Sequence, residues 1–204
     1  MIKEYKNNYN KYFQDQITKF ESFEKDLYAD GIKNTIDFIL KDYNPEFIRV
    51  LDFCCGDGTG SGFIKELGFD VTGFDGNPNK ITKAIENHPT IQFVCTEVLG
   101  MFRRMDTRNT SCFDIIYASH CFEHFLNPLG ILSATKRMLL EFNGEIILIL
   151  PYPNEESEGH PGSKELWLDK SLGVIKKNYE ELGFGVERIE KMNYREPELL
   201  IILK

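Results

Sequence analysis

Hydrophobic residues recur along most of the chain in short runs, and longer amphipathic stretches lie between these runs. The runs are rich in β-branched and aromatic residues, which is typical of buried strands; they lie at residues 47–53, 69–75, 91–95, 113–119 and 144–153. Helix-like segments separate them at residues 60–68, 79–87 and 129–142. Strands that alternate with helices predict a parallel sheet with helices on both faces.

The two ends of the chain differ from this alternation. Near the N-terminus, helical spacing relates Tyr5, Tyr9, Tyr12 and Phe13, and a second amphipathic helix is predicted from Ile32 until Asn44-Pro45. Near the C-terminus, a helix-like stretch is followed by strand-like segments at 184–193 and 197–204. These two segments are too close for a crossover helix, so we expect them to pair antiparallel.

Together these patterns predict an α/β protein with a Rossmann-like, doubly wound sheet, mostly parallel with a C-terminal antiparallel strand. We expect one domain over residues 1–204, made of a helical N-terminal cap over 1–44 and an α/β core over 45–204. The 204 residues, 42% hydrophobic and 27% charged, suit such a domain.

Composition and net charge limit the cellular location and the partners that we expect for the chain. No apolar run approaches the ~20 residues of a membrane span, and the polar N-terminus has no signal-peptide core. The five cysteines are odd in number and lie mostly in or beside apolar runs, so we interpret them as reduced thiols in a cytoplasmic protein. The net charge of −8 disfavours a nucleic-acid partner, because phosphate contacts need a basic face. The sequence does not indicate an oligomeric state.

The stretch DFCCGDGTGSG, residues 52–62, carries four glycines at alternate positions directly after an apolar run. Glycine lets the backbone approach a ligand closely, and a following helix N-terminus favours polar or anionic groups. In open parallel sheets, ligands bind outside the carboxyl ends of the strands. The pattern therefore predicts a site for a nucleotide-like ligand, whereas a simple tight turn would need only one or two glycines.

Two acids accompany the glycines. Asp52 closes the first predicted strand and Asp75 closes the next, where a carboxylate can accept hydrogen bonds from both hydroxyls of a ribose. The dinucleotide fingerprint G-x-G-x-x-G fails in both registers, since its sixth position is Ser61 or Phe63. This failure disfavours an NAD-dependent oxidoreductase.

These segments resemble the class I S-adenosylmethionine (SAM)-dependent methyltransferases. The resemblance rests on VLDFCCGDGTGSGFIKELG, VTGFDGNP, FVCTEV, FDIIYASHCFEHFLNP and KRMLLEFNGEIILILPYP, in that order, over residues 48–153. The fourth segment is similar to the SHxxEHxxxP pattern of a small-molecule methyltransferase group. Cys54 departs from the family's usual glycine, and residues 99–112 are longer than its usual connection.

The resemblance implies SAM as the cofactor, S-adenosylhomocysteine as its product, and a set of contacts. Asp52 and the Gly56–Gly60 backbone would hold the methionine portion, Asp75 the ribose, and Glu97 with Val98 the adenine. Ser119 would lie beside the transferable methyl. The implied cofactor-binding residues are Asp52, Cys54, Gly56, Gly58, Gly60, Asp75, Gly76, Glu97, Val98 and Ser119.

Three histidines, His120, His124 and His160, follow predicted strand ends, where one of them could serve as a general base. His120, His160 and Glu123 are the candidate catalytic residues, while Glu123 and His124 could instead orient the loop and cap the next helix. HCFEH also fits the zinc-protease pattern H-x-x-E-H, but the apolar strand before it and Pro128 after it argue against a protease helix. It resembles the metal-binding E-x-x-E-H segment of small-RNA 3′-end methyltransferases as well, with His120 in place of the first Glu. We expect no metal site.

The sequence thus predicts a SAM-dependent methyltransferase acting on an oxygen or nitrogen atom of a small-molecule or sugar-type acceptor. A non-catalytic SAM- or nucleoside-binding protein of the same fold is the alternative, because a cofactor site alone does not require turnover. The identity of the acceptor cannot be read from the sequence, since proteins of one fold differ chiefly in the site grafted on it.

Overall fold

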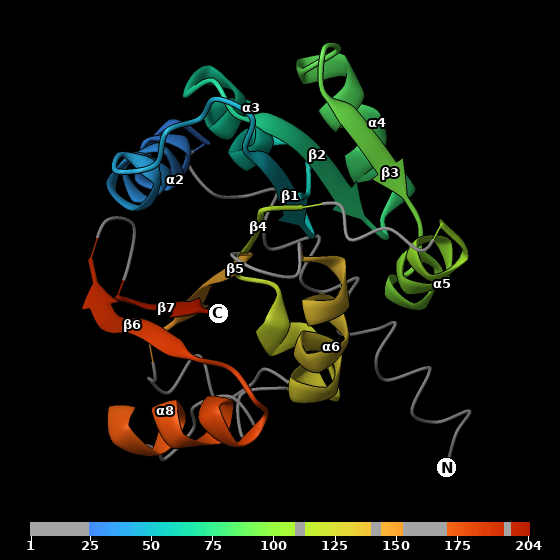
Figure 1. The fold of residues 1–204 in the computed structure, drawn as a ribbon. Coiled ribbons are helices and arrows are strands. Elements are labelled where there is room, and N and C mark those ends of the chain that lie inside the picture. Colours follow the sequence, from blue (N-terminus) through green and yellow to red (C-terminus); the bar gives the residue numbers. More distant parts are fainter. Residues whose placement is uncertain (1–24, 109–112, 140–143, 153–170, 194–196) are drawn as a thin grey trace.

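The computed structural model describes residues 25–108, 113–139, 144–152, 171–193 and 197–204. In this part of the chain a seven-stranded sheet has the order β3-β2-β1-β4-β5-β7-β6 (Figure 1). The strands are β1 (Arg49–Phe53), β2 (Asp70–Asp75), β3 (Gln92–Cys95), β4 (Ile115–Ser119), β5 (Glu145–Pro151), β6 (Val186–Met192) and β7 (Glu198–Leu203). The helices are α2 (Lys25–Leu40), α3 (Thr59–Glu66), α4 (Pro78–Asn87), α5 (Val98–Arg108), α6 (Pro128–Thr135) and α8 (Leu172–Glu181), with short 3₁₀ helices η1 (Phe122–His124) and η2 (Lys136–Met138).

The first five strands are parallel, and β7 enters between β5 and β6 and runs antiparallel to both. The predicted C-terminal antiparallel pair is confirmed, as is the mostly parallel, doubly wound α/β sheet. Because β7 runs the other way, its first residue lies at the edge where the parallel strands end, opposite Pro151 in the register with β5.

Two apolar clusters cover the two faces of the sheet. One joins α2 and α3 to alternate residues of the central strands, for example Ile36 and Ile64 to Val50 and Ile147. The other joins α5, α6 and α8 to the intervening residues of the same strands. This alternation follows from the two-residue period of a strand, which sends successive side chains to opposite faces.

Two details differ from the sequence prediction. Residues 98–108, treated above as part of a long connection, form α5, because Met101 and Phe102 pack into the core. The helix predicted over 129–142 is present but shorter: α6 ends at Thr135 and η2 follows. The chain becomes extended at Leu139, which bridges to Phe113 at the start of the β4 segment, so the pairing with the sheet ends the helix.

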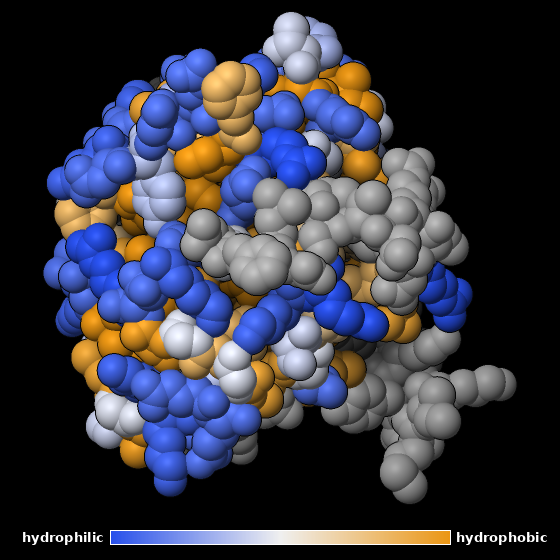
Figure 2. Space-filling view, in the orientation of Figure 1, coloured by the Kyte–Doolittle hydropathy of each residue, from blue (hydrophilic) through white to orange (hydrophobic). Residues whose placement is uncertain are grey.

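The part of the N-terminal cap that the structure describes is α2, which begins earlier and ends earlier than the predicted helix. The aromatic stripe from Tyr5 to Phe13 lies outside the described residues. No helix in the described ranges has the length and apolar composition that a membrane span requires. In the space-filling view, polar side chains cover much of the visible described surface, with apolar residues between them (Figure 2).

Candidate active site

The glycine-rich loop leaves β1 in a left-handed backbone conformation and enters α3. Cys54, Gly56 and Gly58 have φ of 62°, 58° and 83°, and the Cys55 N–H donates to the Phe74 carbonyl oxygen of β2 at 2.9 Å. A Cβ atom on Gly58 would lie 3.0 Å from both Ala84 Cβ and Phe93 Cζ. The loop therefore needs glycine at Gly58 both for its backbone angle and for its close approach to α4 and β3.

Asp75 ties this loop to the end of β2. Its Oδ2 accepts the Gly56 N–H at 3.0 Å, and its Oδ1 accepts the Asn77 N–H at 2.7 Å. A carboxylate has about four lone-pair positions, so these two bonds leave it acceptor capacity toward a ligand. Asp75 is thus rigidly held at the carboxyl edge of the sheet, where the sequence placed it.

Asp52 lies beneath the glycine loop. It is buried, and its Oδ2 accepts a hydrogen bond from the Ser61 hydroxyl of α3 at 2.6 Å. Burial raises the pKa of Asp52 to about 7, although the Ser61 hydrogen bond works in the opposite direction. A Cβ on Gly60 would lie 3.4 Å from Asp52 Oδ2, so Gly60 leaves room above the carboxyl group.

Gly76, a predicted cofactor-binding residue, and the two residues predicted to face the adenine lie at adjacent strand ends. Gly76 follows Asp75 and is exposed; Glu97 is exposed and directly precedes α5, whose first residue is the half-buried Val98. The Thr96 N–H donates to the Asp75 carbonyl oxygen at 3.2 Å, which brings the end of β3 beside the end of β2. Sequence reasoning did not single out Lys80, whose Cδ and Nζ lie 3.9 Å from the position of a Cβ on Gly56.

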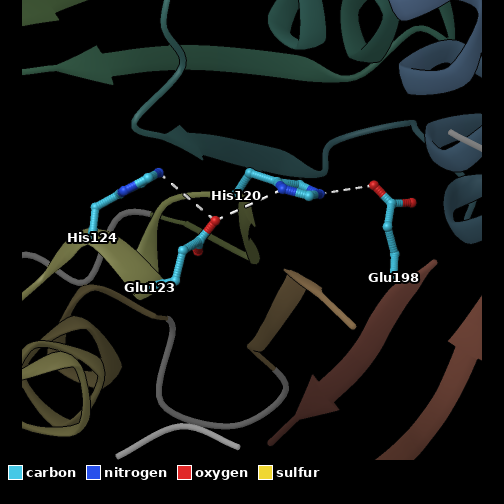
Figure 3. Close-up of polar contacts among 4 residues, drawn as sticks. All are labelled: His120, Glu123, His124 and Glu198. Carbon is cyan, nitrogen blue, oxygen red and sulfur yellow. Dashed lines mark hydrogen bonds and ion pairs between the residues drawn. The ribbon is translucent and has the colours of Figure 1, made fainter. Parts of the chain in front are cut away.

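His120 lies at the end of β4, directly after Ser119, with a left-handed φ of 49°. Its N–H donates to the Ile149 carbonyl oxygen of β5 at 2.8 Å. The ring lies between two buried carboxylates: Nε2 is 2.8 Å from Glu198 Oε1, and Nδ1 is 3.7 Å from Glu123 Oε1 (Figure 3). His124 Nε2 lies 3.8 Å from the same Glu123 oxygen, so the four side chains form one continuous chain of contacts.

The His120 segment touches the glycine-rich loop through two thiols. Cys54, in the loop after β1, packs against the apolar cluster that includes Cys121, in the segment after β4, and each thiol influences the pKa of the other. Burial raises the pKa of Cys121 well above its ordinary value, which keeps this thiol protonated. The structure thus brings the predicted cofactor loop and the predicted base together at one edge of the sheet.

Glu198 is the residue of this cluster that sequence reasoning missed. It is 2% exposed and opens β7. The sequence did contain a signal for Glu198. It is a carboxylate at the first position of an apolar antiparallel strand, and such a position lies at the edge of the sheet where the parallel strands end. His160 lies outside the described residues, so its predicted catalytic role stays a prediction. Within the described ranges, no group of three or more His, Cys, Asp or Glu side chains is arranged to hold a metal ion.

A family model described as a methyltransferase domain matches residues 20–183. The chain belongs to this methyltransferase-domain family. The predicted class I SAM-dependent methyltransferase, with SAM as its cofactor, is thereby confirmed at the level of the family. The described residues fit this cofactor as well, since Asp75 lies at the carboxyl edge of the sheet beside the glycine-rich loop and keeps acceptor capacity toward a ligand.

Known methyltransferases resemble the chain in sequence and in fold. It is 34% identical over 95 residues to the ubiquinone biosynthesis O-methyltransferase of Haemophilus ducreyi, a stretch that covers 45% of this chain and 40% of that protein. The chain thus spans less than half of that relative's length. A SAM-dependent methyltransferase from Aquifex aeolicus has a TM-score of 0.65 at 18% identity, covering 93% of this chain and 96% of its own. Magnesium protoporphyrin IX methyltransferase from Synechocystis, crystallised with SAM, has a TM-score of 0.62 at 13% identity, covering 87% of this chain and 79% of its own. At these identities the solved methyltransferases establish the fold alone.

Proposed function

We propose that this methyltransferase-family chain, as one domain, transfers a methyl group from SAM to an oxygen or nitrogen atom of a small-molecule acceptor, sugar-type metabolites included. The observation that carries the proposal is the placement of His120 beside the glycine-rich loop, with its ring anchored between two buried carboxylates. The name of the Haemophilus ducreyi relative, an O-methyltransferase, favours oxygen as the acceptor atom.

The cofactor would supply the activated methyl group, and the protein would supply orientation, which is worth about 7–11 kcal/mol in well-ordered systems. Asp52 and the glycine-rich loop would hold its methionine portion and Asp75 its ribose. Glu97, Val98 and Gly76 would border its adenine. Ser119 would lie next to the methyl group.

His120 is the proposed general base. Its Nδ1 would take the proton of the acceptor, and Glu123 Oε1 at 3.7 Å stabilises the positive charge that forms on the ring. A base near neutral pH matters most for a hydroxyl acceptor, because a neutral hydroxyl is a weak nucleophile.

The first test is calorimetric titration of the purified protein with SAM, S-adenosylhomocysteine and NAD. We expect the first two to bind and NAD not to bind. Asp75→Ala should weaken SAM binding about tenfold or more, since each tenfold corresponds to about 1.4 kcal/mol. Asp70→Ala is the matched control, because Asp70 is an exposed residue at the opposite end of the same strand.

The second test separates an enzyme from a non-catalytic SAM-binding protein. Release of S-adenosylhomocysteine is measured with a panel of hydroxylated aromatics, amines and sugars, with and without EDTA. Turnover that His120→Ala lowers while SAM affinity is kept supports the proposal. SAM binding without turnover of any acceptor supports the non-catalytic alternative. Loss of turnover in EDTA would favour a third possibility, a metal-dependent RNA 3′-end methyltransferase, to which the segment at His120–His124 has some likeness.

A further inference from the structure

Glu198 lies far from the family's sequence motifs but makes the shorter of the two described carboxylate contacts to the ring of the proposed base. Its Oε1 lies 2.8 Å from His120 Nε2, and its side chain is 2% exposed. A carboxylate is rarely buried to this extent without a specific partner, because removing it from water is costly. The contact therefore defines the state of both groups.

An ionised Glu198 would decide where the proton of the ring lies. An ionised carboxylate only accepts hydrogen bonds, so the nitrogen that faces it must carry the hydrogen. In that state His120 Nε2–H would donate to Glu198, and Nδ1 would be the basic nitrogen of the neutral ring. This nitrogen is on the Glu123 side of the ring (Figure 3).

We propose that Glu198 is a positioning residue for the methyl-transfer reaction: it holds His120 as the Nε2–H tautomer and stabilises the imidazolium that forms when Nδ1 takes the acceptor's proton. The inference rests on the function proposed above. The acceptor gives its proton to Nδ1 and uses the electron pair of that bond to bind the methyl carbon. The electrons of the broken carbon–sulfur bond stay on sulfur, so atoms and charges balance.

The position of Glu198 in the fold suits this role. Strand β7 is hydrogen-bonded on both sides, to β5 and β6, and every one of its residues is buried. His120 is fixed from the other side by its backbone hydrogen bond to Ile149 of β5. Both partners are therefore held by the central sheet, which keeps the ring in one orientation. A loop would hold the ring less precisely.

The ionisable groups that face His120 among the described residues are few. Glu123, on η1, lies on its Nδ1 side, and Glu198, on β7, lies on its Nε2 side. His124 contacts the far side of the same Glu123 oxygen. Because these two described neighbours are carboxylates, removing one negative charge should make the ring lose its proton at lower pH.

The decisive experiment is nitrogen-15 NMR of the histidine rings in the full chain, with His120→Ala used to assign the signal. We expect the Nε2–H tautomer for neutral His120. In Glu198→Gln, which keeps the size of the side chain and a carbonyl acceptor, the ring should titrate with a midpoint at clearly lower pH. Glu190→Gln is the matched control on β6, since this half-exposed carboxylate pairs with Arg188, and its midpoint should equal that of the wild type.

An Nδ1–H tautomer in the wild-type protein would overturn the proposal, and this measurement needs no variant to fold. An unchanged midpoint in a folded Glu198→Gln protein would overturn it too. Both readings need neither cofactor nor acceptor. The tautomer and the effect of Glu198 on the ring can therefore be confirmed even if no acceptor is turned over. In that case only the proposed enzymatic function fails.

With an acceptor that is turned over, kinetics complete the test. Glu198→Gln should lower kcat and move the acidic limb of the pH profile to lower pH, with KM for SAM unchanged. In a His120→Ala background the same change should have no further effect on kcat, because a positioning residue acts only through the group it positions. A further loss in that background would assign Glu198 a merely structural role.

Discussion

At the scale of single residues, burial changes the titration of Asp52, the acid beneath the glycine-rich loop. Asp52 is buried at the end of β1. Among the described side chains, only Ser61 donates a hydrogen bond to it. Burial, opposed by that hydrogen bond, raises its pKa from an ordinary 3.8 to about 7. The carboxyl group is therefore harder to ionise in the folded protein than in the unfolded chain.

This shift predicts a pH dependence of stability. Between about pH 4 and 7 the folded state keeps a proton that the unfolded state has lost, so this group makes the free energy of unfolding fall as the pH rises through that window. The slope is at most about 1.4 kcal/mol per pH unit. In Asp52→Asn this contribution disappears, and the variant should gain stability relative to the wild type from pH 4 to 7.

Denaturant unfolding of both proteins at several pH values measures the difference. Asp70→Asn is the control, because Asp70 is exposed and should leave the pH dependence as it is. A difference between Asp52→Asn and wild type that stays constant over the window would contradict the assigned shift.

At the scale of elements, the contact between β2 and β3 depends on the absence of a side chain. A Cβ on Gly73 would lie 2.4 Å from Phe93 Cδ1 and 3.0 Å from Cys55 Sγ. Gly73→Ala should therefore overpack this face and lower the free energy of unfolding by about 1–3 kcal/mol. Adding Phe93→Leu should recover part of the loss, since it removes the ring that the new methyl group meets.

A glycine in an open position provides the matched comparison. Gly173, in the first turn of α8, is exposed, and among the described residues the nearest side-chain atom to its Cβ position is Ser171 Oγ at 3.9 Å. Gly173→Ala should stabilise the protein by up to about 1 kcal/mol through helix propensity. Urea unfolding of the two alanine variants should give shifts of opposite sign, and equal shifts would refute the steric argument.

At the scale of the whole molecule, the antiparallel strand β7 completes the sheet and carries Glu198 to the site. Ile201 is fully buried and pairs with Leu148 of β5 and Ile189 of β6. Ile201→Ala should lower the free energy of unfolding by about 2–5 kcal/mol. Ile189→Ala, on the edge strand and only half-buried, should cost clearly less when both are measured by urea unfolding.

The sequence by itself determined the order and type of most elements, the glycine-rich loop and the two acids that accompany it. These features are local: strand and helix periodicity, glycine where the backbone must turn sharply, and a carboxylate at a strand end are all visible within a few residues. The end of the helix at Thr135 was not visible in this way, because the pairing of Leu139 with Phe113 decides it. Helix α5 was missed as well, since packing of Met101 and Phe102 stabilises a segment of weak pattern.

Only the tertiary structure decided which charged side chains meet. His120 and Glu198 are 78 positions apart, and no local pattern relates residues at that separation. They come together because a strand that runs antiparallel begins where its parallel neighbours end. Burial, which isolates this contact from water and raises the pKa of Asp52, likewise depends on the whole packed sheet and its two layers of helices.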